Sequence, residues 1–312
     1  MKILFTGGSS FTGLWFVKAL SEAGHSVTAT LTRPANSYDG IRRQRVDQLG
    51  SMATVAEETT FGTPRFSRLL AHEGPFDLLC HHAAEATNYN SADFDATSAL
   101  ASNTNNLRPI LAELTANGGR AVVLTGSVFE ADEGRGDSDL RPAFNAYGLS
   151  KSMTAQAFRY YVAGQGLSLG KFVIPNPFGP WEEPRFTAYL MNTWQKGATA
   201  EVKTPDYVRD NVPIDLLAAC YERFAATVAE TADGFVRVGP SCYAETQGQF
   251  AERFAGEMRR RLDLACALTI GKQTDFSQPM VRVNTDSARA IVPAWDEAPF
   301  WDGVASFYQR QP

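Results

Sequence analysis

The chain has 312 residues, of which 44% are hydrophobic and 20% charged, and its formal net charge at pH 7 is −5. This length can bury a substantial core in one large domain or two closely packed ones. Acidic and basic residues are interleaved without a basic tail or an arginine-rich stripe, so nucleic acid is not expected as a partner.

Local patterns argue against three other classes. No stretch approaches the ~18 consecutive apolar residues of a membrane span, and the N-terminus enters a strand-like run without an apolar leader. We therefore expect a cytoplasmic protein that does not bind a membrane. The four cysteines are far apart and show no Cys-x-x-Cys spacing, which predicts neither a disulfide scaffold nor a metal site.

Short apolar runs alternate with longer amphipathic ones over the first two-thirds of the chain. Strands are predicted at 2–6, 26–32, 76–82, 120–127 and 169–176. Helices are predicted at 12–23, 92–116 and 147–163. A further helix at 212–228, a strand at 234–240 and a helix at 249–262 follow, and then an irregular C-terminal segment. This alternation predicts an α/β fold with a parallel sheet between two layers of helices.

The segment FTGGSSFTG, residues 5–13, lies between the first strand and the first helix. Gly7 permits a tight turn, and Gly13 permits close packing of strand and helix. Backbone N–H groups at the helix start would then face a pyrophosphate. Ser10 stands where a dinucleotide-binding loop has its middle glycine, and a plain structural corner is the alternative interpretation.

Two further patterns point to proton transfer. Tyr147 and Lys151 are four residues apart on a predicted helix, so they share one face. A lysine ammonium beside a phenol is expected to lower the phenol pKa and make tyrosine an acid/base, although the spacing also occurs by chance. Thr125 and Ser127 place hydroxyls beyond a strand end, where a doubly wound sheet binds its ligands, unless they only satisfy the local backbone.

Together these segments resemble the extended short-chain dehydrogenase/reductases, the sugar-nucleotide epimerase/dehydratase family. TGGSSFTG resembles the family's TGGxGFxG loop, and DLLCHHAA resembles its D-x-x-x-H-x-A-A strand. IPNPFGP, RDNVPIDLLAA and RVNTDSARAIVPAW resemble three later family segments, in order and with similar spacing. The leading arginine of the first of these three is Ile174 here.

The resemblance implies a Rossmann-type doubly wound sheet with a smaller, mostly helical C-terminal substrate lobe. We expect residues 1–175 and 212–240 to form the NAD(P)-binding domain, and 176–211 and 241–312 the substrate-binding lobe. The implied catalytic residues are Thr125, Tyr147 and Lys151. Tyr147 and Lys151 are also expected to contact the cofactor. The other expected cofactor contacts are Gly7, Ser9, Ser10, Phe11, Thr12, Gly13, Arg33, Ala83, Ala84, Asn103 and Pro175. Substrate contacts are expected from Glu85, Ser127, Asn176, Arg209 and Arg282.

The end of the second strand bears on cofactor choice. An acidic residue there would bind the ribose 2′-hydroxyl of NAD, whereas a cation would meet the 2′-phosphate of NADP. The sequence has LTRP, with Arg33 and no acid. The forked guanidinium suits a phosphate, so NADP(H) is favoured and NAD(H) stays possible. Alternatively, Arg33 stacks on adenine without discriminating.

Family dehydratases carry Asp-Glu after the threonine, where this chain has Gly126 and Ser127, so dehydration is not expected. His81 and His82 are interpreted as structural. The favoured function is an NADP(H)-dependent reductase of a nucleotide-linked keto sugar, and the alternative is an NAD-dependent nucleotide-sugar 4-epimerase. A dinucleotide-sensing regulator is a third reading, which the complete Thr/Tyr/Lys set disfavours. The resemblance also implies a homodimer through the helix that carries Tyr147.

Overall fold

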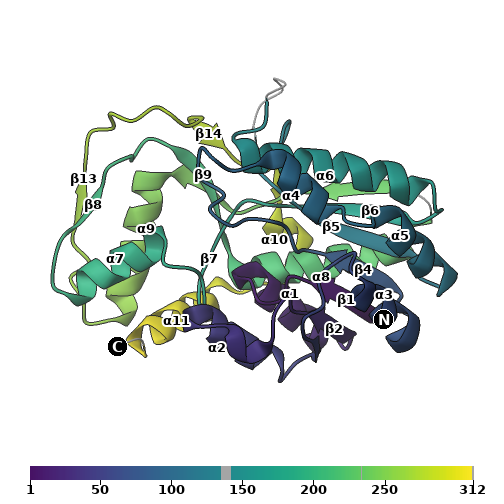
Figure 1. Ribbon diagram of the computed structural model, residues 1–312. Coiled ribbons are helices and arrows are strands. Elements are labelled where there is room, and N and C mark those ends of the chain that lie inside the picture. Colours follow the sequence, from purple (N-terminus) through teal and green to yellow (C-terminus); the bar gives the residue numbers. More distant parts are fainter. Residues whose placement is uncertain (135–141, 233, 311–312) are drawn as a thin grey trace.

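The computed structural model describes residues 1–134, 142–232 and 234–310. A parallel seven-stranded sheet with the order β10-β6-β5-β4-β1-β2-β3 forms its centre (Figure 1). The strands are β1 (Lys2–Thr6), β2 (Ser26–Thr30), β3 (Thr54–Ala56), β4 (Leu78–His81), β5 (Ala121–Ser127), β6 (Ser168–Ile174) and β10 (Phe235–Val238). The order reverses between β1 and β4, as in a doubly wound sheet, and confirms the predicted α/β Rossmann-type fold.

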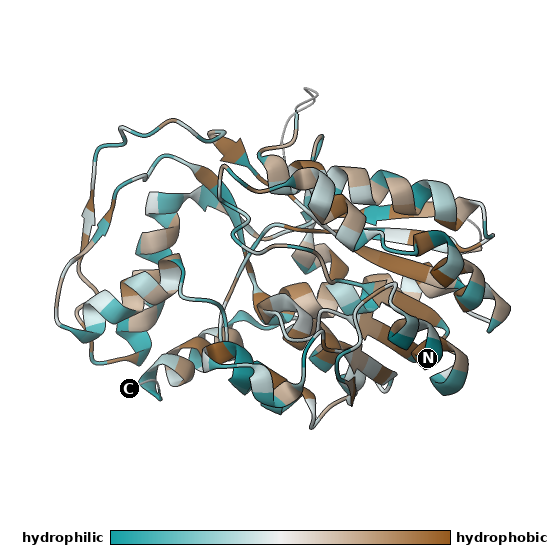
Figure 2. Cartoon of the chain, viewed as in Figure 1, coloured by the Kyte–Doolittle hydropathy of each residue, from teal (hydrophilic) through white to brown (hydrophobic). Residues whose placement is uncertain are grey.

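Helices cover both faces of this sheet. Side chains such as Phe5 pack against one layer, and Leu4, its neighbour in β1, packs against the other. The first layer is α1 (Phe11–Glu22), α2 (Gly40–Leu49) and α8 (Ile214–Glu230). The second is α3 (Pro64–Glu73), α4 (Ala96–Asn103), α5 (Leu107–Ala116) and α6 (Ala146–Ala163). Because both faces of the central strands are buried, these strands are mostly apolar, and much of the sheet is coloured as hydrophobic in Figure 2.

A smaller lobe adjoins the sheet beyond the carboxyl ends of its strands, at the left of Figure 1. Its helices are α7 (Phe186–Gln195), α9 (Gln247–Arg261) and α11 (Glu297–Gln309). A second sheet joins β7 (Asn176–Phe178), β9 (Val208–Pro213), β12 (Tyr243–Thr246) and β14 (Val281–Arg282). Shorter elements are η1 (Ala35–Ser37), β8 (Ala200–Val202), β11 (Pro240–Ser241), β13 (Leu268–Ile270), β15 (Asp286–Ser287) and α10 (Ala288–Ile291). The lobe is therefore partly helical and partly sheet.

Two predicted elements differ from the structure. The single helix expected at 92–116 is two helices, because the chain turns sharply at Asn106, which has a φ of +50°. The C-terminal segment expected to be irregular contains α11, which buries Trp301 and Val304. Pro299 and Gly303 weaken the helical pattern in the sequence, but Pro299 lies in the first turn, where its missing N–H is tolerated.

Within the residues that the structure describes, no helix combines the length and the apolar character that a bilayer crossing requires.

Candidate active site

The turn between β1 and α1 has the narrow backbone path expected of a phosphate-binding loop. Gly7 has a φ of +83°, and a Cβ there would lie 2.8 Å from the backbone nitrogen of Ala83. A Cβ on Gly13 would lie 2.3 Å from the carbonyl oxygen of Gly7. Both positions therefore need glycine. The start of α1 keeps the geometry that can hold a dinucleotide pyrophosphate.

Ser10, which replaces the middle glycine, is the N-cap of α1. Its Oγ accepts a hydrogen bond from the Gly13 backbone N–H at 3.0 Å and donates one to the Gly7 carbonyl at 3.0 Å. The hydroxyl therefore closes the turn from inside. Its hydrogen is used within the loop, so an anion at this site would be met by backbone N–H groups rather than by the Ser10 hydroxyl.

Two arginines follow β2 and share one aromatic ring. The guanidinium carbons of Arg33 and Arg42 lie 4.5 and 5.4 Å from the centre of the Tyr38 ring. Arg42 also donates from Nε and Nη2 to the Ser9 hydroxyl in the loop, at 3.2 and 3.0 Å. Among the described residues neither arginine forms an ion pair. Two uncompensated cations next to the loop suit a phosphate group.

Side chains fix the backbone that follows β4. The Thr6 hydroxyl accepts from the Ala83 N–H at 3.0 Å. The Asn103 side chain is buried, and its Oδ1 accepts from the Glu85 N–H at 2.8 Å while its Nδ2 donates to Thr154. Asn103 therefore fixes the segment that contains Ala83 and Glu85, and both polar atoms of its side chain already have partners within the protein.

Tyr147 and Lys151 lie one turn apart near the start of α6, on the helix predicted for them. Asn145 caps this helix by accepting from the Gly148 N–H at 2.8 Å. Lys151 is 4% exposed, and burial lowers the pKa of its ammonium to about 8. Glu130 opposes this change because its charge favours the ammonium form.

The expected lowering of the Tyr147 pKa by Lys151 is not found. Burial raises the pKa of the Tyr147 phenol, and Glu130 and Tyr89 raise it further. Arg185 opposes these effects. A half-buried phenol near a carboxylate is held in its neutral form, so Tyr147 carries its proton in this structure.

Aromatic side chains surround Tyr147. The ring centres of Tyr89, Phe94 and Phe129 lie 5.4, 6.0 and 6.2 Å from its own. Arg185, at the N-cap of α7, lies 5.9 Å over Tyr89. The catalytic candidate therefore occupies an aromatic environment with a cation at its edge, which limits access of water to the phenol.

Thr125 lies at the end of β5, but on the sheet face opposite to α6. It pairs in register with Phe172, whose ring packs in the layer of α1 and α8. Its hydroxyl is 3.0 Å from Nδ1 of His82. Within the described residues, no hydrogen bond joins Thr125 to Tyr147. The sequence brings these residues near the same sheet edge, and the structure adds His82 between Thr125 and the loop.

Arg282 is a buried cation without a carboxylate partner among the described residues. It is 7% exposed and stacks on Phe129 and Phe144, at 4.1 and 4.9 Å from the ring centres. Its Nε and Nη1 atoms are buried without a hydrogen-bond partner. Burial, together with the neighbouring Arg209, lowers its pKa to about 9. Buried, unsatisfied donors of this kind indicate a site for an anion.

Arg209, by contrast, uses its donors within the protein. Its Nη1 donates to the carbonyls of Val208 and Pro279 at 2.9 and 3.0 Å, and its Nη2 donates to Oε1 of Gln278 at 3.0 Å. The guanidinium also stacks on Tyr207. Arg209 thus ties the segment before β14 to β9, and Arg282 is the better placed of the two arginines to meet a ligand.

The family follows from a comparison with known sequences. The model of the NAD dependent epimerase/dehydratase family matches residues 3–234. The chain belongs to this family. The match spans most of the sequence and confirms the resemblance to extended short-chain dehydrogenase/reductases, a family of NAD(P)-dependent enzymes. No curated protein sequence matches the chain.

Solved structures of other family members share the fold. A UDP-glucose 4-epimerase from Thermotoga maritima is 17% identical with a TM-score of 0.73, and 99% of each chain is covered. A UDP-glucuronic acid 4-epimerase from Bacillus cereus with NAD is 15% identical with a TM-score of 0.74, and 99% of each chain is again covered. A UDP-glucose 4-epimerase from Stenotrophomonas with bound NAD is 16% identical with a TM-score of 0.76, and the match covers 99% of this chain and 98% of that chain. At these identities the likeness concerns the fold.

A side chain at the position after Thr125, where the family's dehydratases have a carboxylate, would crowd two neighbouring side chains in this protein. A Cβ on Gly126 would lie 2.8 Å from Cε of Lys171 and 2.9 Å from Oε1 of Glu130. Glu130 is buried, forms an ion pair with Lys171 at 2.6 Å and accepts from the Ser127 N–H at 2.8 Å. The space next to Gly126 is thus occupied by an internal ion pair.

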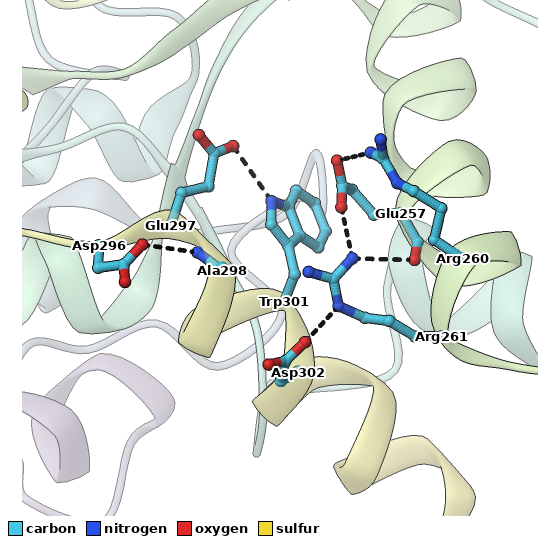
Figure 3. Close-up of a pocket in the computed structure, with 8 residues that line it drawn as sticks. All are labelled: Glu257, Arg260, Arg261, Asp296, Glu297, Ala298, Trp301 and Asp302. Atoms are coloured by element: carbon cyan, nitrogen blue, oxygen red, sulfur yellow. Dashed lines mark hydrogen bonds and ion pairs between the residues drawn. The ribbon is translucent and has the colours of Figure 1, made fainter.

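Two surface pockets were found, one in the smaller lobe and one next to Tyr147. One of about 580 Å³ lies between α9 and α11 (Figure 3). Its arginines, Arg260 and Arg261, pair with Glu257 and Asp302, so these two cations are compensated within the protein. A second, of about 520 Å³, includes Phe94 beside Tyr147 and is lined otherwise mainly by acidic and hydroxyl side chains. No group of His, Cys, Asp and Glu in the described part of the chain could hold a metal ion.

Other expected residues lie around the same edge of the sheet. Asn176 begins β7 and Pro175 is buried before it, while Phe11 and Thr12 begin α1. Sequence reasoning missed Arg42, Tyr89 and Arg185, and it gave His82 only a packing role. A second arginine, Arg42, follows Arg33 by nine residues in the sequence, and this was a usable signal. The loop positions of Tyr89 and Arg185 gave none, because only the folded chain brings them to Tyr147.

Proposed function

We propose that this protein is an NAD(P)-dependent epimerase of a nucleotide diphosphate sugar. The guanidinium of Arg282, which is buried and has no ion-pair partner among the described residues, supports the substrate class, because it lies one aromatic ring away from Tyr147 and can be satisfied by a diphosphate. A sugar joined to that diphosphate would then extend past Phe129 toward the Tyr147 phenol. Asn176, Glu85 and Ser127 are the other proposed substrate contacts.

The loop from Gly7 to Gly13 and the start of α1 would hold the pyrophosphate of the dinucleotide, and Lys151 its nicotinamide ribose. The dinucleotide supplies reversible hydride exchange with a sugar carbon. Tyr147 then exchanges a proton with the oxygen on that carbon, and its phenol, which burial keeps neutral, carries the proton that a keto oxygen would receive. The surrounding aromatic rings exclude water, which strengthens this hydrogen bond.

Epimerisation is supported over dehydration and reduction by two observations. The glycine at position 126 and the Glu130–Lys171 pair leave no room for a dehydratase carboxylate. The three similar structures described above are 4-epimerases, two of them with NAD. The reductase that the sequence analysis favoured lacks this support, so it becomes the second candidate.

The test is an assay of UDP-, dTDP- and GDP-hexoses with the purified protein. An epimerase interconverts two sugars without net consumption of cofactor, whereas a reductase consumes one NAD(P)H for each product. Tyr147→Phe should lower kcat about 100-fold or more while leaving dinucleotide binding within about threefold, because only the transferred proton is lost. Turnover of the Phe variant at the wild-type rate would contradict the role of Tyr147.

The second candidate is an NADP(H)-dependent reductase of a nucleotide-linked keto sugar. Arg33 and Arg42 favour it, because two cations that form no ion pair with any described residue suit the 2′-phosphate of NADP. Stoichiometric oxidation of NADPH by a keto sugar nucleotide, without epimer formation, would replace the first candidate by this one.

A homodimer through α6 and a cytoplasmic location remain part of the proposal. In the segment predicted for the interface, Phe158 and Val162 are buried, whereas Tyr160 is 75% exposed and Tyr161 is 39% exposed. Light scattering of Tyr160→Glu against the wild type tests the dimer. The division into a dinucleotide domain (1–175 and 212–240) and a substrate lobe is likewise a prediction.

A further inference from the structure

His82 links the dinucleotide loop to the end of β5. Its Nε2 is 2.9 Å from the Ser10 hydroxyl and 3.1 Å from the Thr12 hydroxyl, and its Nδ1 is 3.0 Å from the Thr125 hydroxyl. The ring is held from two sides by Phe5 and Phe16, with ring centres 5.6 and 5.3 Å away. One imidazole therefore spans the gap between the two segments.

The partners of Ser10 determine which nitrogen of His82 carries hydrogen. The Ser10 hydroxyl lies 3.0 Å from the Gly7 carbonyl, and this oxygen-to-oxygen contact is favourable only if the hydroxyl donates its hydrogen there. Ser10 Oγ also accepts from the Gly13 N–H. Because its hydrogen is used, Ser10 can only accept from His82. Nε2 of His82 must therefore be protonated.

The charge state of His82 then determines its second hydrogen bond. Burial, with the nearby charges of Lys151 and His81, lowers its pKa to about 3, so the ring is neutral. A neutral imidazole protonated at Nε2 has an unprotonated Nδ1. Nδ1 can only accept, so the Thr125 hydroxyl donates to it. Because its hydrogen is used in this bond, the Thr125 hydroxyl cannot donate one to a keto oxygen.

We propose that His82 is a positioning residue that fixes the Thr125 hydroxyl as a hydrogen-bond donor to the imidazole and ties it to the Ser10 cap of the dinucleotide loop. The inference rests on the proposed function for the roles of Thr125 and the loop. It assigns proton donation to the substrate oxygen to Tyr147 without a second donor from Thr125. Because the imidazole ring is rigid, a displacement of Ser10 in the dinucleotide loop would also displace Thr125 at the end of β5.

Three variants separate the two ends of this link. His82→Leu removes both hydrogen bonds at similar volume, His82→Asn keeps a short acceptor toward Thr125, and His82→Gln keeps a longer donor toward Ser10. We expect kcat of the Leu variant to fall about 10- to 100-fold with KM for the sugar nucleotide within threefold, the size expected when a buried partner is removed. Compared with His82→Leu, His82→Asn should recover most of the lost kcat. His82→Gln should recover the dinucleotide affinity but not kcat.

His72, which is exposed on α3, provides the matched control, since His72→Leu should change neither kcat nor dinucleotide affinity. Equal kcat in His82→Leu and wild type would overturn the proposal. So would equal losses in the Leu and Asn variants, because a structural role would not be rescued by one acceptor.

Nitrogen-15 NMR of the histidine rings in the wild-type protein tests the link without turnover or substrate. The expected signal for His82 is the neutral Nε2–H tautomer from pH 6 to 8, with an Nδ1 resonance that moves in Thr125→Val. An Nδ1–H tautomer, or a charged ring at pH 6, would overturn the proposal even if the protein is an epimerase. The expected tautomer in a protein without epimerase activity would instead contradict only the proposed function.

Discussion

Arg282 shows how a single buried side chain can point to a ligand. A guanidinium with two unsatisfied buried nitrogens destabilises the folded protein, since desolvation of the charge is not compensated by a partner. Arg209 is equally buried but has its donors satisfied by the segment before β14. The sequence analysis expected both arginines to contact the substrate, but within the described residues only Arg282 keeps buried donors without a partner for the proposed ligand.

We therefore expect Arg282→Met to raise KM for the sugar nucleotide about 10- to 100-fold, because the variant keeps the apolar stack but loses a charged hydrogen-bond donor. Its free energy of unfolding should stay equal or rise by about 1 kcal/mol, since a buried unpaired charge is removed. Arg209→Met should instead lower the free energy of unfolding by about 1–2 kcal/mol, and it should change KM for the sugar nucleotide less than Arg282→Met does. Enzyme kinetics and urea unfolding measure both; a destabilised Arg282→Met would contradict the argument.

At this scale the sequence predicted the residues whose roles depend on local spacing. Tyr147 and Lys151 share a helix face because four residues make about one turn, and Gly7 and Gly13 mark a turn that only glycine fits. It did not predict the hydrogen bonds of His82, which join residues 72 and 43 positions apart. The raised pKa of Tyr147 was also missed, because it depends first on burial in the folded chain and then on the charge of Glu130 from another segment.

Among the elements, the buried strands were the easiest to predict. β1, β4 and β5 are short runs of mainly apolar residues and β2 and β6 are rich in β-branched or apolar residues, because both faces of these strands are covered by helices. α11 was missed because its apolar stripe is interrupted by a glycine and preceded by a proline. The long helix expected at 92–116 was wrong because its break at Asn106 depends on backbone conformation rather than on a proline.

The segment from β2 to α2 carries the prediction on cofactor choice. Arg33→Ala and Arg42→Ala should each reduce the preference for NADPH over NADH about tenfold, because each removes a cation from the proposed 2′-phosphate site. Arg43→Ala is the control, since Arg43 lies on the same helix but pairs with Asp47 at 2.7 Å. Fluorescence titration of both dinucleotides measures the ratio. A ratio unchanged in the double variant would show that neither arginine meets the phosphate.

Across the whole molecule, the two sheets are joined through one buried carboxylate. Asp210 of β9 is fully buried, and its two oxygens accept from the backbone N–H groups of Cys242 and Asn284, at 2.9 and 3.0 Å. The Asn284 side chain in turn donates to the Val173 carbonyl of β6 at 2.9 Å. The small sheet, which carries Arg282, is thereby fixed against the central sheet, which carries Thr125. The sequence showed the R-D pair of β9, but the use of its aspartate as a link between sheets required the fold.

Replacement of Asp210 tests whether this link stabilises the arrangement. In Asp210→Asn the amide NH₂ would face one of the two backbone N–H groups, so one donor is left unsatisfied, and we expect a loss of about 1–3 kcal/mol in the free energy of unfolding. Asp263→Asn, at an exposed position, should change it by less than about 0.5 kcal/mol. Urea unfolding followed by tryptophan fluorescence gives both values. If the link also positions the site, KM for the sugar nucleotide should rise in Asp210→Asn under conditions where the protein is still folded. An unchanged stability would mean that the two sheets are held together by their apolar contacts alone.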